Sequence, residues 1–143
     1  MSAKRSEERK RTVDIPQMIC HPRDVSWGMV ELEAEVSTWI GALADEEFGR
    51  VEFYIDLLEE KGVHLGEPYT RQLRGKLRQL RFYLGPSGDA VRISYYVATG
   101  RRIILLTVFK KRRRRERAEI DRAEQAMRRC IKEKHEPEDD ADA

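Results

Sequence analysis

Arginine and tyrosine side chains recur in the second half of the chain at the spacing of β-strand faces. In segment 90–97, alternation places Arg92 and Tyr96 on one face and Tyr95 on the other. In segment 77–83 it places Arg78 and Arg81 on opposite faces. A guanidinium group binds phosphate oxygens and a tyrosine ring stacks on nucleobases, so these faces predict a nucleic-acid platform. The alternative is an exposed sheet face whose cationic side chains prevent edge pairing.

The charge of the chain is divided between two regions. Residues 71–117 carry 15 Lys or Arg against two acids, a net charge of +13, whereas residues 25–70 carry 11 acids against two bases, a net charge of −9. The total of +2 hides this dipole. Because charge asymmetry informs on partners rather than on fold, we expect the basic half to face a polyanion.

The length of 143 residues suits one domain with irregular ends. We expect residues 25–132 to form the domain, residues 1–24 to be a disordered arm, and residues 133–143 to be a disordered acidic tail. No apolar stretch is long enough to cross a membrane, and the charged N-terminus has no secretory h-region. Cys20 and Cys130 fit no zinc spacing, so the sequence predicts a reduced, cytoplasmic protein without metal or cofactor.

Hydrophobic periodicity predicts the order of the elements. A strand is expected at 25–32, and two helices, at 36–43 and 45–61, are expected to pack as a hairpin on a sheet. Strands at 77–83, 90–97 and 103–109 are joined by short turns and predict an antiparallel meander. A helix should begin at Glu116. The fold class is therefore α+β, a small antiparallel sheet with helices on one face, an N-terminal helical hairpin and a C-terminal helix.

Five short motifs follow one another from residue 62 onward. They are Gly62 with Leu65 and Pro68; Leu77 with Leu80 and Arg81; Arg92 with Ile93 and Tyr95; Phe109 with Lys110 and Lys111; and Glu119 with Ile120 and Ala123. In this order they resemble the RelE/ParE superfamily of toxins from toxin–antitoxin pairs, and the phage-related HigB-like branch in particular. The resemblance covers roughly residues 27–130 and implies a RelE-like sheet.

The resemblance implies a ribosome-dependent endoribonuclease that cuts mRNA without a metal, by attack of the 2′-hydroxyl on the adjacent phosphate. A cognate antitoxin, often with a helix-turn-helix, would neutralise it. The implied catalytic residues are Arg81, Arg92, Lys110 and Lys111. The implied RNA-binding residues are Lys76, Arg78, Tyr96, Arg112 and Arg113.

Two departures from the family pattern concern the details of the site and the contacts with RNA or antitoxin. Gln79 stands where the family often has Glu, and Arg112 to Arg115 stand where Thr and Pro are usual. Three rival hypotheses remain: a ParE-like gyrase inhibitor, which shares the fold; a non-catalytic nucleic-acid-binding protein, which would also be rich in Arg and Lys; and an inactive toxin that still binds its antitoxin, which Gln79 motivates. The sequence does not identify the general base or the sequence preference.

Overall fold

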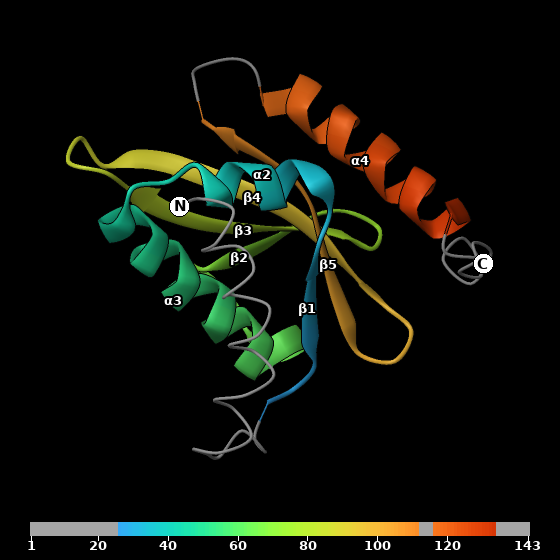
Figure 1. Ribbon diagram of the computed structural model, residues 1–143. Helices are drawn as coiled ribbons and strands as arrows, with labels where there is room; N and C mark the ends of the chain where they lie inside the picture. Colours follow the sequence, from blue (N-terminus) through green and yellow to red (C-terminus); the bar gives the residue numbers. More distant parts are fainter. Residues whose placement is uncertain (1–25, 112–115, 134–143) are drawn as a thin grey trace.

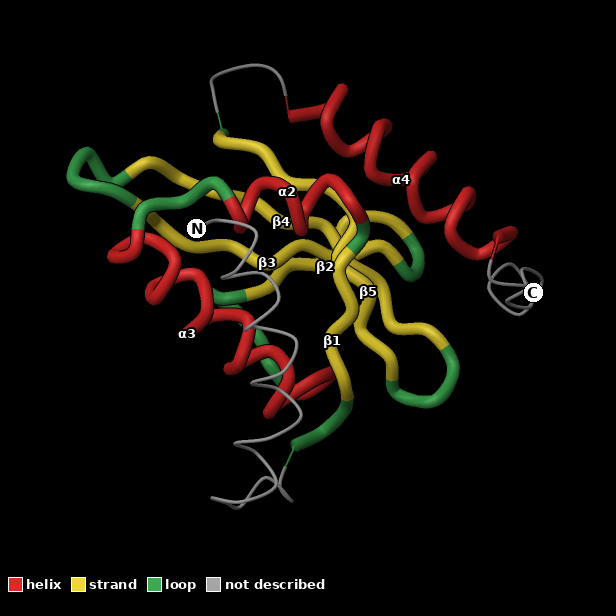
Figure 2. The backbone as a smooth tube through the Cα atoms, in the orientation of Figure 1, coloured by secondary structure: helices red, strands yellow, loops and turns green. Residues whose placement is uncertain are grey.

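The computed structural model describes residues 26–111 and 116–133 (Figure 1). In chain order the elements are β1 (Met29–Leu32), α2 (Ala34–Gly41), α3 (Asp45–Lys61), the 3-10 turn η2 (Gly62–His64), β2 (Thr70–Arg74), β3 (Leu77–Leu84), β4 (Asp89–Ala98), β5 (Arg102–Lys110) and α4 (Glu116–Glu133). The described strands form one five-stranded sheet in the order β1-β5-β4-β3-β2 (Figure 2). The fold class is α+β, as predicted.

The sheet is mixed, which corrects the prediction of an antiparallel sheet. The meander β3-β4-β5 is antiparallel as expected, but β1 pairs with β5 in parallel. The chain leaves β1 through α2 and α3, so nothing local in the sequence fixes the direction in which β1 meets β5. Strand β2 was not predicted, because its sequence TRQLR is polar and it pairs only with β3 at the sheet edge.

Helices cover both faces of the sheet, so the prediction of helices on one face is wrong. Helices α2 and α3 close one face over Leu80, Ile93 and Leu105. Helix α4 closes the other face over Tyr96 and Ile104. The central strands β4 and β5 are apolar on both faces through much of their length, and the second apolar face requires its own helix.

The boundaries of the helices agree closely with the periodicity. Helix α3 spans the predicted residues 45–61, and Gly62 follows it with a φ of 53°. A Cβ at Gly62 would lie 2.1 Å from the Trp27 ring, so the position requires glycine. Helix α4 begins at Glu116 as predicted. The packing of α2 on α3 as a hairpin stays a prediction, and residues 1–24 and most of the acidic tail lie outside the described residues.

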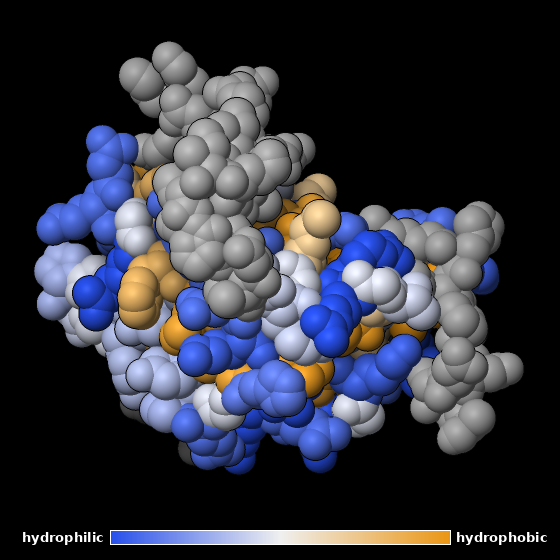
Figure 3. All heavy atoms as spheres, turned by 90° about the horizontal axis from the view of Figure 1, so that it is seen from below, coloured by the Kyte–Doolittle hydropathy of each residue, from blue (hydrophilic) through white to orange (hydrophobic). Residues whose placement is uncertain are grey.

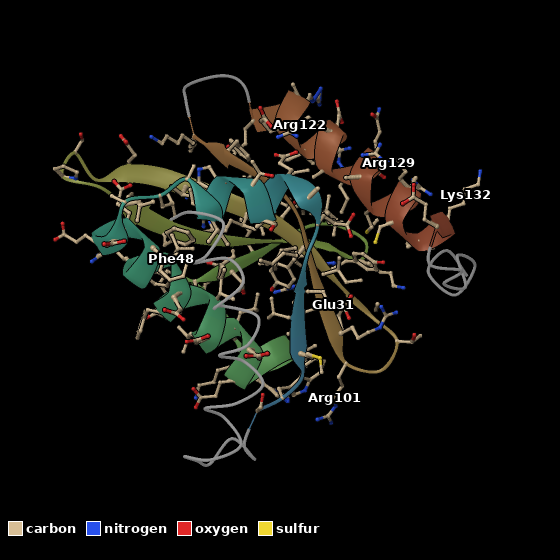
Figure 4. All side chains as sticks on the ribbon, viewed as in Figure 1. Glu31, Phe48, Arg101, Arg122, Arg129 and Lys132 are labelled. Carbon is tan, nitrogen blue, oxygen red and sulfur yellow. The ribbon has the colours of Figure 1, made fainter. Side chains whose placement is uncertain are left out.

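Two arginines attach α4 to the rest of the fold. Arg122 lies on α4 (Figure 4) and its guanidinium contacts Glu35 of α2 at 2.6 Å and Glu119 at 2.9 Å. Arg74 of β2 contacts Asp121 at 2.8 Å and Glu124 at 2.7 Å. These contacts hold the helix over one part of the sheet and thereby define which part of that face it leaves uncovered.

Candidate nucleic-acid interface

The face of the sheet beneath α4 has an apolar zone and a polar zone. The apolar zone packs against Ala123, Met127, Cys130 and Ile131 of the helix. Further along the same strands, the residues that share this face become polar. They are Arg71 on β2, Gln79 and Arg81 on β3, Arg92 and Ser94 on β4, and Thr107 on β5. We call this set the polar zone.

Arg81 and Arg92 lie directly opposite each other on β3 and β4. Arg92 is only 4% exposed, and its Nη1 donates to the carbonyl oxygen of Val91 at 3.3 Å. The buried Nε atoms of both arginines have no hydrogen-bond partner among the described residues. A buried and a half-buried cation side by side, each with an unused buried donor, call for an anion that offers several acceptor oxygens, and phosphate is such an anion.

The electrostatic environment of Arg92 agrees with that geometry. Burial lowers the pKa of Arg92, and the positive charge of Arg81 lowers it further. Glu116 at the start of α4 and Tyr83 act in the opposite direction, and Arg71 adds a small lowering. The positive charge is therefore held in a poorly solvated place, where a bound anion would gain more than it would in water.

Neutral hydrogen-bonding groups lie next to the arginine pair. Gln79 is 1% exposed, and its Oε1 has no partner among the described residues. It pairs with Ser94, whose Oγ lies 2.6 Å from the Oγ1 of Thr107 and accepts the Thr107 backbone N–H at 3.0 Å. A β-bulge follows on β5, where Leu106 is the extra residue between the pairs Ser94–Thr107 and Tyr95–Leu105. The bulge shifts the register between β4 and β5, so that Leu106 and Thr107 both face α4.

The two candidate lysines occupy different places. Lys111 lies 3.9 Å from Glu116, the carboxylate that also acts on Arg92, so it borders the polar zone. Lys110 pairs in register with Val91, which belongs to the core beneath α2 and α3, and its ammonium lies 3.5 Å from Asp89. The structure brings Lys111 toward the arginine pair but gives Lys110 a separate carboxylate partner.

Tyr96 cannot be the base-stacking residue in this arrangement, which corrects the sequence prediction. Its side chain is 0% exposed beneath α4, and its hydroxyl donates to the Sγ of Cys130 at 3.4 Å. Alternation identified the correct face but could not show that α4 covers it. Lys76 lies at this covered end, with its ammonium 6.0 Å from the centre of the Tyr96 ring.

Arg78 lies on the opposite face from the arginine pair. Its Nε donates to the Tyr95 hydroxyl at 3.3 Å, and its Nη2 donates to the Thr70 hydroxyl at 3.4 Å. Burial raises the pKa of Tyr95, which lies in the core as its face predicted. Arg78 therefore has a structural role in this arrangement. Arg112 and Arg113 lie outside the described residues.

Tyr83 was missed by the sequence reasoning although a signal was present. It follows Arg81 by two positions in β3 and therefore shares its face. It is 62% exposed and close enough to Arg92 to affect its pKa. Arg71 was missed for a different reason, since it belongs to the unpredicted strand β2.

Neither a metal site nor a membrane helix is found within residues 26–111 and 116–133. No group of three or more His, Cys, Asp or Glu side chains there is arranged to hold a metal ion. No helix in that part of the chain is long and apolar enough to cross a membrane. Among the coloured residues visible in Figure 3, hydrophilic side chains predominate and hydrophobic areas lie between them.

A family model for phage-derived protein Gp49-like (DUF891) matches residues 38–128. The match covers more than half of the chain, from within α2 to within α4. It therefore includes the whole polar zone. No curated protein matches the chain.

Proposed function

The chain belongs to the phage-derived Gp49-like (DUF891) family, within the RelE/ParE-like toxin superfamily, and from this premise we propose that it is an RNA-cleaving toxin. The family indicates the toxin of a toxin–antitoxin pair, whose partner is an antitoxin. The finer proposal is a HigB-like, ribosome-dependent endoribonuclease that acts on mRNA in the cytoplasm and is neutralised by an antitoxin with a helix-turn-helix.

The observation that carries the proposal is the arginine pair with its unused Nε donors. In RNA cleavage the 2′-oxygen attacks the adjacent phosphorus, its proton passes to a base, and the 5′-oxygen leaves with a proton from an acid. The products are a 2′,3′-cyclic phosphate and a 5′-hydroxyl. Negative charge grows on the phosphate oxygens in the transition state, and Arg81 and Arg92 would stabilise it there.

The surroundings of the pair support a polyanionic substrate. Arg71 and Lys111 border the pair, so a bound RNA backbone would meet cations on either side of the scissile phosphate. Lys111, whose ammonium lies 3.9 Å from the Glu116 carboxylate, is the candidate to transfer a proton as acid or base. Binding that depends on these contacts should weaken steeply as salt rises.

The test compares growth and mRNA integrity in cells that express the chain. Wild type should stop growth and produce new 5′ ends in mRNA, detected by primer extension. Arg81→Ala combined with Arg92→Ala should abolish both effects while the protein stays folded. Arg128→Ala is the matched control, because Arg128 is an exposed arginine on α4 that contacts Glu124 and should keep both effects.

Other outcomes separate the alternatives. Growth arrest with intact mRNA and blocked DNA supercoiling would indicate a gyrase inhibitor. Continued growth with folded protein that still binds antitoxin would indicate an inactive toxin. Continued growth with RNA binding but no cleavage would indicate a non-catalytic nucleic-acid-binding protein.

A further inference from the structure

The side chain of Tyr83 projects from the sheet beside the arginine pair. Its neighbours Phe82 and Leu84 belong to the core beneath α2 and α3, so the Tyr83 ring must lie on the other face with Arg81. Two residues along a strand are separated by about 6.7 Å. The Nε of Arg50 donates to the Tyr83 carbonyl oxygen at 3.2 Å and fixes the backbone from the α3 side.

The Tyr83 ring has an open surface. Its partner on β4 is Ala90, which is too small to cover a ring. Within the described residues no aromatic ring or cation stacks on it, and its hydroxyl has no hydrogen-bond partner. The other two exposed aromatic side chains, Phe53 and Tyr69, each contact the ring of Tyr54.

We infer that Tyr83 stacks on a nucleobase that flanks the phosphate held by Arg81 and Arg92. The inference rests on the proposed function, since it places the base in relation to that phosphate. A ligand that satisfies this surface must combine an anionic phosphate with a flat aromatic group, and a nucleotide within RNA has both. Stacking is stronger on a larger π surface, so purines are favoured over pyrimidines.

With Tyr83 in this role, the site requires a nucleotide and not merely an anion. The arginine pair alone would accept inorganic phosphate as well as RNA. A base that stacks on Tyr83 adds contact area but forms no specific hydrogen bonds with it. Stacking therefore gives a preference among bases and no strict sequence specificity. Tyr83 is thus assigned to substrate preference, and Arg81 and Arg92 to the phosphate.

The test is isothermal titration of the full chain with ligands that cannot be cleaved. The ligands are a 2′-O-methyl tri-adenylate, the uridine equivalent, the same backbone with abasic sugars, and inorganic phosphate. Tyr83→Ala should weaken tri-adenylate binding by about 5- to 150-fold, the loss expected when one stacked base is freed. The abasic ligand and phosphate should bind the variant as they bind wild type.

Three further variants make the result specific. Tyr83→Trp keeps a flat ring and should retain tri-adenylate binding. If the alanine variant folds poorly, loss of tri-adenylate binding by the folded tryptophan variant would contradict a stacking role. Phe53→Ala removes a comparably exposed ring from α3 and should bind all ligands as wild type does. Arg92→Ala should lose phosphate and every oligonucleotide.

The outcomes distinguish the two proposals. If wild type binds phosphate through Arg92 but Tyr83→Ala binds tri-adenylate like wild type, the assignment of Tyr83 is wrong and the phosphate site stands. If wild type binds neither phosphate nor any oligonucleotide, the phosphate site of the proposed function fails and Tyr83 fails with it. Equal affinity of wild type for the adenine and uridine ligands would overturn the purine preference.

Discussion

Replacing Arg92 by methionine should stabilise the free protein and abolish its anion binding. The substitution removes a buried N–H donor that has no partner, and such a group costs about 1–3 kcal/mol. It also removes a charge directly opposite Arg81, which costs about 0.2–1 kcal/mol. The one hydrogen bond to Val91 is lost, about 0.5–1.5 kcal/mol in the other direction. We expect a net gain of about 1–2 kcal/mol.

Thermal denaturation measures the effect in a buffer without phosphate or sulfate. Each kcal/mol raises Tm by about 4–8 °C in a domain near 100 residues, so the expected gain should raise Tm by about 4–16 °C. The lowered pKa of Arg92 means that the folded state destabilises the charged side chain. Arginine stays protonated throughout the ordinary pH range, so this destabilisation does not change with pH there. The difference between the two proteins should therefore be constant from pH 5 to 9.

A bound oligonucleotide should make wild type more stable than the Arg92→Met variant. At a concentration of 100 times Kd, a 2′-O-methyl oligonucleotide should stabilise wild type by about 2.7 kcal/mol and leave the Arg92→Met variant unchanged. Arg78→Met is the control, since Arg78 is hydrogen-bonded to Tyr95 and Thr70 and its loss should cost about 1–2 kcal/mol. If Arg92→Met is less stable than wild type by more than 1 kcal/mol without ligand, the arginine is part of the structural core and the reasoning is refuted.

Three other substitutions test the surroundings of the site. Glu35→Ala should lower the free energy of unfolding in urea by about 2 kcal/mol, because the Val108 N–H loses its acceptor and Arg122 loses an ion pair. Glu35→Gln keeps an acceptor oxygen and should lower it by less than about 1 kcal/mol; equal losses would contradict this. Tyr95→Phe should flatten the alkaline fall in stability. Burial raises the pKa of Tyr95, so the unfolded chain loses this proton first and wild-type stability falls as pH rises above about 10; identical alkaline slopes would exclude the effect. Gln79→Glu should raise Tm and lower phosphate affinity by at least about tenfold, because a carboxylate would then neutralise the arginine pair; unchanged affinity would mean that Gln79 does not face the pair.

The strand faces and the pairing of Arg81 with Arg92 could be predicted from the sequence. Alternation separated Arg78 from Arg81, and the short turn at residues 85–88 set the register that brings Arg81 opposite Arg92. The burial of Tyr96 could not be predicted, because alternation does not say which face a later helix covers. The face of Tyr96 was read as polar since Arg92 and Ser94 share it, yet α4 covers only its apolar part.

The direction of β1 and the existence of β2 could not be predicted from local sequence patterns. A four-residue strand carries no signal of whether its partner runs parallel or antiparallel, and that choice depends on the path of α2 and α3. A polar edge strand buries too few apolar side chains to show alternation. The basic strand β2 nevertheless supplies Arg71 to the polar zone, so the site is wider than the sequence indicated.

The parallel pairing of β1 with β5 has a consequence for the order of folding. β1 is the first described strand and β5 the last, so Met29 pairs with Arg102 across most of the described chain. Such long-range pairings slow folding, and here β5, the strand that joins β1 to the rest of the sheet, is also the last described strand to leave the ribosome during synthesis. A chain that terminates before β5 can form the β3-β4 hairpin but has neither the β5 neighbour of Arg92 nor the strand that joins β1 to the sheet. Products of interrupted synthesis would therefore carry both arginines without the buried frame that keeps them together.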